Sequence, residues 1–176
     1  MITFRQLLEE IPDATSRHLL RQFNLAQRST GRAQSVRDLA LSLGFDVTEK
    51  SFPLGIDGRL VADPFASNGY EIQVNKHHSV ERRRWTLMHE IAHFFLHRNH
   101  EDFFAENSYR ASPGFHFYRS DELVEEKQAN EFVAAAFFGD GALAAINSWF
   151  QGDVKKISRA FGLSEKAIRI ALKEKH

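Results

Sequence analysis

The residues with the clearest chemical potential form one short run, His89-Glu90-Ile91-Ala92-His93. Residues four apart share one face of a helix, so His89 and His93 can present two imidazole nitrogens to a single metal ion. Glu90 lies one position round the same helix, where a carboxylate can accept a proton from a water molecule that the metal activates. The H-E-x-x-H pattern therefore predicts a metal-dependent hydrolytic site.

The segment around this motif, from Trp85 to Leu96, is mostly apolar and predicts a buried helix. Bare imidazole and carboxylate groups are costly to bury, so a shared metal ion would explain their placement. The alternative is a helix whose two histidines face the surface by coincidence, with Leu87, Ile91 and Phe94 as its apolar stripe.

A third metal ligand is expected on a second helix, because a catalytic zinc ion usually has three protein ligands and an open position for water. The chain has no cysteine, which leaves His, Asp or Glu. The segment 120–138 predicts this helix, with Ser120 as N-cap and apolar residues at helical spacing. Glu126 falls on or beside the apolar stripe. The acids that are more easily solvated are Glu122, Glu125 and Glu131.

The two motifs together resemble the ImmA/IrrE family of intracellular zinc metallopeptidases. The first reads R-x-T-L-x-H-E-x-x-H-x-x-L-H over 84–97, and the second reads E-x-x-A-N-x-F-x-A over 126–134. The strand-like segment 70–75 and the closing segment 157–164 are also similar to the family. The resemblance covers roughly residues 34–172.

The resemblance implies that His89, His93 and Glu126 bind one zinc ion per chain and that Glu90 is the general base. Family members act on helix-turn-helix repressors, often encoded beside them, and relieve repression in mobile elements or stress responses. Some relatives act as toxin-like partners of such regulators. The chain departs from the family at 137–140, where a Leu-Met-Pro-like segment is frequent, and in the long aromatic stretch between the motifs. Both departures bear on substrate specificity.

Composition limits the class of protein. A chain of 176 residues predicts one domain, 1–176, with an N-terminal helical extension over 1–30 and a family-like core over 34–172. Zero net charge and a pI near 7.2 argue against direct nucleic-acid binding. No apolar run reaches the length of a membrane span, and charged residues occupy the N-terminus where a signal peptide is apolar. We therefore expect a cytoplasmic protein that does not bind membranes.

The expected fold class is α+β, a compact zincin-like fold of the gluzincin type. Helical spacing predicts helices over 3–10, 16–28 and 36–43. The apolar side of the second is expected to carry Leu19, Leu20 and Phe23, and to extend to Leu25. Three strands, predicted over 45–48, 59–62 and 70–75, form a small sheet packed on the H-E-x-x-H helix. The strand 70–75 is interpreted as an edge strand that can pair with extended substrate. The alternative, which is compatible with this role, is an ordinary half-buried strand with Tyr70, Ile72 and Val74 inward.

The C-terminal segment 153–172 resembles a helix-turn-helix, with Asp153 and Ser164 as N-caps. The second helix of such a pair can enter the major groove of DNA. It offers mainly Glu165, Lys166 and Arg169 for this purpose, which is little positive charge for DNA. The alternative, which we favour, is two helices that pack on the peptidase core.

The segment 97–119 has no clear period and is rich in aromatic residues, so we interpret it as a lid or a wall of the substrate groove. His116, Tyr118 and Tyr109 are the candidates for oxyanion or substrate contacts. His97 and Asn130 are the candidates for residues that hydrogen-bond to the metal ligands and orient them. The alternative for each histidine and for Asn130 is a surface position, and for each tyrosine it is packing.

Overall fold

The computed structural model describes residues 1–97, 110–111 and 120–173. Backbone contacts divide the chain into two compact units. We call Val36–Asn130 the sheet unit, and Met1–Ser35 together with Glu131–His176 the helical unit. The expected combination of helices with a small sheet is confirmed. The assignment of 1–176 to a single domain stays a prediction.

In its described residues, 36–97, 110–111 and 120–130, the sheet unit has a small mixed sheet and three helices. Its elements are α3 (Val36–Ser42), β1 (Asp46–Lys50), β2 (Ile56–Ala62), β3 (Tyr70–Asn75), α4 (Val80–His97), β4 (Arg110–Ala111) and the first part of α6 (Ser120–Phe138). The strand order is β1-β3-β2-β4, in which β1 and β3 are parallel and the other pairs are antiparallel. The three predicted strands are present, and the two-residue β4 extends the sheet beyond β2.

The strand β3 is central, so the expectation that 70–75 is an edge strand for substrate pairing is wrong. Ile72 lies beside Val47 of β1 and Leu60 of β2. The four residues from Ile72 to Asn75 are all buried, as is typical of a strand covered on both faces. The alternating apolar residues of this segment identify a strand, but they do not say which strands lie beside it.

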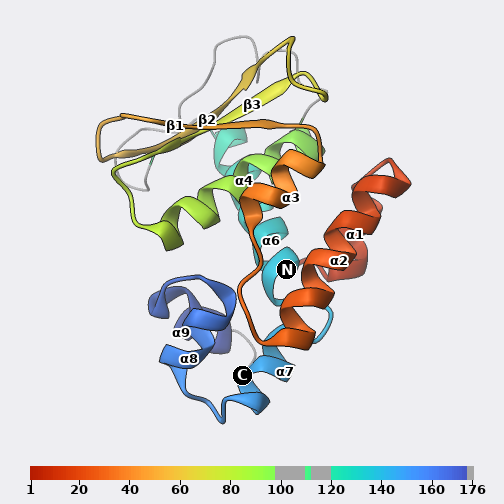
Figure 1. Cartoon of the computed structure of the whole chain (residues 1–176), viewed down its shortest axis with the longest axis vertical. Helices are drawn as coiled ribbons and strands as arrows, with labels where there is room; N and C mark the ends of the chain where they lie inside the picture. The colour runs from red at the N-terminus through yellow and green to blue at the C-terminus, as the bar shows by residue number, and fades with distance from the viewer. Residues whose placement is uncertain (98–109, 112–119, 174–176) are drawn as a thin grey trace. The chain divides into compact units, whose positions relative to one another are not determined.

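Two helices, α3 and α4, lie on the same face of this sheet (Figure 1). Phe94 of α4 packs edge-on against Phe45 and Tyr70, with ring centroids 4.9 and 5.4 Å apart. At Gly58 of β2 the strand passes so close to α4 that an added Cβ would lie 3.0 Å from Cγ2 of Thr86. These contacts fix the position of α4 against the sheet.

The turn from β3 into α4 is anchored by the buried side chain of Asn75. Its Nδ2 donates to the backbone oxygens of Phe52, Pro53 and Ile56 at 3.2, 3.0 and 2.9 Å. Its Oδ1 accepts from the backbone nitrogen of His77 at 3.0 Å. One amide therefore ties the loop before β2 to the start of the helix that carries H-E-x-x-H.

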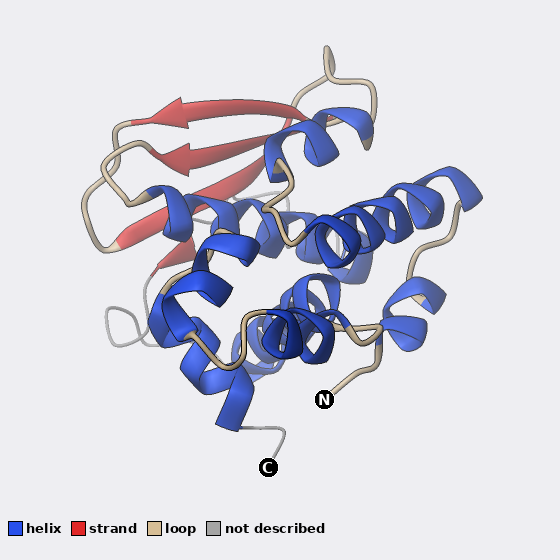
Figure 2. Ribbon diagram, turned by 60° about the horizontal axis from the view of Figure 1, so that its bottom comes forward, coloured by secondary structure: helices blue, strands red, loops and turns tan. Residues whose placement is uncertain are grey.

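The helical unit contains no strand among its described residues (Figure 2). Its helices are α1 (Phe4–Glu9), α2 (Ala14–Thr30), the end of α6, α7 (Ala142–Trp149), α8 (Val154–Phe161) and α9 (Glu165–Lys173). The predicted N-caps of the last two helices are confirmed, because Asp153 accepts from the nitrogen of Lys156 at 3.2 Å and Ser164 from that of Ala167 at 3.1 Å.

Within this unit, α2 caps the end of α6 with buried amides. Nδ2 of Asn24 donates to the oxygen of Ala136 at 3.3 Å, and Nε2 of Gln27 donates to that of Phe137 at 3.0 Å. The last carbonyls of a helix lack partners within the helix, so these amides satisfy them. Leu25, predicted on the apolar side of α2, is 44% exposed, because the buried face of α2 includes these two amides.

In the described part of the chain, no single helix is long and apolar enough to cross a membrane. Val124–Phe138 and Ala142–Trp149 reach the required length and hydropathy only as a pair, which is bent by 48°.

Candidate metal centre

The helix α4 holds the H-E-x-x-H motif in the interior of the sheet unit. Every residue from Thr86 to Phe95 is buried, although the segment includes two imidazoles and a carboxylate. His93 and Glu90 are fully buried, and His89 is 8% exposed. The alternative of two surface histidines is therefore excluded for this helix.

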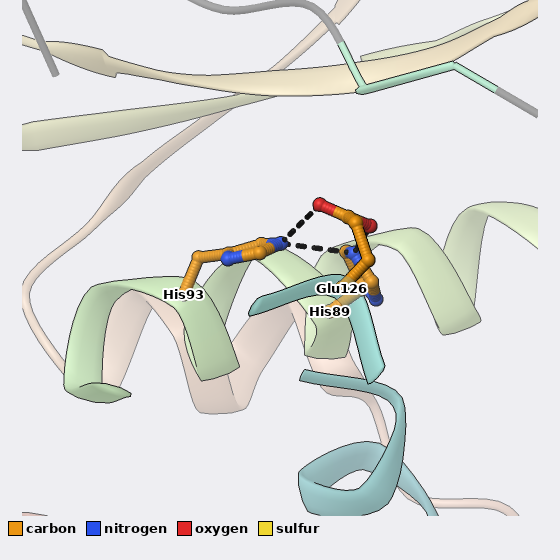
Figure 3. A group of neighbouring side chains, drawn as sticks. All are labelled: His89, His93 and Glu126. Carbon is orange, nitrogen blue, oxygen red and sulfur yellow. Dashed lines mark hydrogen bonds and ion pairs between the residues drawn. The ribbon is translucent and has the colours of Figure 1, made fainter. Parts of the chain in front are cut away.

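The carboxylate of Glu126 on α6 meets the two imidazoles on one side of α4 (Figure 3). Its Oε2 lies 2.9 Å from Nε2 of His89, and its Oε1 lies 3.0 Å from Nε2 of His93. The two Nε2 atoms lie 3.0 Å from each other. Two elements that are far apart in sequence therefore bring three metal-ligating atoms together.

Electrostatics favours the charged form of this carboxylate. Burial raises the pKa of Glu126, but hydrogen bonds and charge attraction from His89 and His93 outweigh it, so the pKa lies well below its usual range. Glu126 is therefore an anion at neutral pH, as a metal ligand must be.

The arrangement fits a metal ion. A tetrahedral zinc ion with ligands at about 2.0–2.1 Å holds its ligand atoms roughly 3.3 Å apart. The separations of 2.9–3.0 Å are within a few tenths of an ångström of that value. Atoms with facing lone pairs at such distances need a proton or a cation between them. His89, His93 and Glu126 can thus hold a metal ion.

The remaining sequence-predicted residues fall into three groups. His97 contacts the ring nitrogen of His93 that does not face Glu126. Its Nδ1 is 2.9 Å from Nδ1 of His93, and its Nε2 is 3.1 Å from Oε1 of Gln128. Asn130 is exposed on α6, which favours its interpretation as a surface amide. The other three predicted residues lie outside the described part of the chain; they are Tyr109, His116 and Tyr118.

Sequence reasoning did not identify Gln128. Its position two residues after Glu126 does not predict a contact with the site, because its partner His97 lies 31 residues away in the sequence.

Two histidines of a buried H-E-x-x-H helix, with a glutamate from a second helix, define a metallopeptidase-type site. The chain belongs to the IrrE N-terminal-like domain family, a peptidase family, which it matches over residues 40–173. This match confirms the resemblance to ImmA/IrrE proteins over nearly the same range of residues. A comparison with curated proteins finds no match to this chain.

Proposed function

We propose that the protein is a zinc-dependent endopeptidase that cleaves a helix-turn-helix transcriptional repressor encoded nearby. The setting is a mobile element, a toxin–antitoxin pair or a stress response, and the reaction takes place in the cytoplasm beside the repressor. The observation that supports this best is the buried meeting of His89, His93 and Glu126, with Glu90 adjacent on the same helix.

In this proposal His89, His93 and Glu126 hold the zinc ion. When bound, zinc lowers the pKa of a water molecule and polarises the scissile carbonyl. The carboxylate of Glu90 accepts the proton of the attacking water and then delivers it to the leaving amine. Glu90 is fully buried, so its carboxylate exchanges protons with groups inside the site and not with bulk water. This burial supports its role as the general base.

The decisive experiment compares wild type with Glu90→Gln. The zinc-loaded proteins are incubated with the repressor encoded beside the gene, and cleavage is followed by mass spectrometry. We expect Glu90→Gln to keep its zinc and to lose cleavage by roughly 10²–10⁴-fold, which is the usual effect of a general acid–base group. Glu81→Gln makes the same change at an exposed position of α4 and should cleave normally. An uncut repressor in the presence of zinc-loaded wild type would contradict the proposal.

Two other functions give different results in the same system. A non-catalytic partner that holds the repressor, or acts with it as a toxin, would keep its biological effect in Glu90→Gln. A DNA-binding protein with a structural metal would bind duplex DNA in a salt-dependent manner.

A further inference from the structure

A row of side chains continues from the metal centre away from the metal. His93 faces the centre with Nε2 and faces His97 with Nδ1, at a distance of 2.9 Å. His97 in turn faces Oε1 of Gln128 with its Nε2, at 3.1 Å. His93 and His97 are buried at 0% and 3% exposure, so the contact between the two rings is shielded from water.

The direction of these hydrogen bonds follows from the last member of the row. The amide oxygen of Gln128 can only accept, so Nε2 of His97 must carry a proton. In a neutral imidazole the other nitrogen is then an acceptor, so Nδ1 of His97 accepts a hydrogen bond that the N–H at Nδ1 of His93 donates. When a metal ion takes the place of the protons that otherwise link the imidazoles to Glu126, Nε2 of His93 keeps only its lone pair, which faces the metal centre. This is the tautomer that binds a metal.

We propose that His97 and Gln128 are positioning residues, which orient the ring of His93 and select the tautomer whose Nε2 can bind zinc. The inference rests on the proposed function, since it assumes that zinc occupies the centre. His97 follows His93 by one helical turn, as His93 follows His89, but its Nε2 points to Gln128 rather than to the centre. His97 therefore acts through His93 and is not a fourth ligand.

One turn of α6 therefore carries two residues that contact the histidine helix. Glu126 contacts the metal side of the histidines, and Gln128 holds the far side of the row. Both contacts join α6 to α4, so one helix supplies a ligand and also anchors a ligand of the other helix.

The first test measures zinc affinity by competition with a chromophoric chelator. His97→Leu keeps the size of the side chain and removes the acceptor, so we expect roughly 10–100-fold weaker binding, the usual effect of losing such a partner. His97→Asn puts an amide oxygen near the position of Nδ1 and should restore most of the affinity. A merely structural role for His97 does not predict this rescue.

The same measurement applies to Gln128, whose exposed position makes loss of folding on substitution an unexpected outcome. Gln128→Ala should weaken zinc binding by about 10-fold or somewhat less, the low end of the range expected for His97→Leu. Gln128→Glu keeps an acceptor and should keep the affinity. Lys127→Gln, at the exposed neighbouring position, is the control and should bind zinc as wild type does.

The second test needs no variant. Long-range ¹H–¹⁵N correlation spectra of the zinc-loaded protein report which nitrogen of each histidine is protonated. We expect His93 to be protonated at Nδ1 and His97 at Nε2. Protonation of His97 at Nδ1, or at both nitrogens, would overturn the proposal even if a variant failed to fold.

The outcomes distinguish failure of the positioning role from failure of the proposed function. Wild type that binds no zinc overturns the proposed function and this inference together. Wild type that binds zinc, with a folded His97→Leu that binds it equally well, overturns only the positioning role.

Discussion

The carboxylate of Glu126 lies 2.9 Å from Nε2 of His89, although 37 residues separate the two along the chain. The contact joins α4 to α6 and places a negative charge beside two buried imidazoles. Without this charge, the two Nε2 atoms would remain 3.0 Å apart with no anion to balance a cation between them. Glu126 is therefore the residue on which metal binding by this group most depends.

We expect Glu126→Ala to lose its metal. Purified wild type should contain about one zinc ion per chain by plasma mass spectrometry, and Glu126→Ala much less, because only two ligands remain. Glu131→Ala removes the same side chain five positions along α6 and should retain zinc. Wild type that holds no metal after zinc is added back would refute the peptidase proposal. Equal zinc content in Glu126→Ala and wild type would exclude Glu126 as a ligand.

The parts of the site that follow local periodicity could be predicted from the sequence. The spacing of His89 and His93 puts them on one face of a helix whatever the rest of the chain does. The apolar stripe of 120–138 selected Glu126 among several acids, because helical spacing tells which side of a helix faces inward. Both helices are present, and their inward faces meet at these residues.

The parts that depend on distant partners could not be predicted. The central position of β3 follows from pairing with strands on both sides, and alternation in one segment carries no information about neighbours. Asn24 and Gln27 are polar and would be placed outside, yet they are buried because carbonyls more than 100 residues away accept hydrogen bonds from their amide groups. Gln128 was missed for the same reason, whereas His97 was among the candidates because it follows His93 by one helical turn.

Asn75 should be essential for the stability of the sheet unit. Asn75→Ala leaves the carbonyls of Phe52, Pro53 and Ile56 without this donor, and a buried group that loses its partner costs about 1–3 kcal/mol. Asn75→Asp places an acceptor against these acceptors and should be at least as harmful. Urea unfolding measures both variants. Lys76→Ala, at the exposed next position, is the control, and a fully stable Asn75→Ala would refute the anchoring role.

The N-cap of α2 should make stability depend on pH. The backbone hydrogen bond from Ser16 holds the pKa of Asp13 below its ordinary value of 3.8. A carboxyl with a lowered pKa in the folded state stabilises the fold above the unfolded pKa, and this contribution disappears as the pH falls through the folded value.

Asn is an equally good N-cap without a charge, so Asp13→Asn isolates this effect. Wild type should be the more stable protein at pH 7, and the difference should shrink as the pH falls below about 4. Urea midpoints of both proteins from pH 7 to pH 3 test the prediction, and a difference that stays constant over this range would speak against it.

Gly58 should couple the sheet to the metal centre. A Cβ at this position would lie 2.3 Å from the backbone oxygen of Gln73 and 3.0 Å from Cγ2 of Thr86, which precedes His89 by one helical turn. The strand must therefore shift away from Gln73 of β3 and from Thr86 of α4 in Gly58→Ala, and overpacking of this kind costs about 1–3 kcal/mol. Because the sheet fixes α4, the displaced helix should also bind zinc more weakly.

Thermal unfolding and chelator competition measure the two effects, with Ala62→Ser as the control that adds one atom at an exposed position of β2. Lower stability with unchanged zinc affinity would mean that the histidine helix keeps its geometry independently of the sheet.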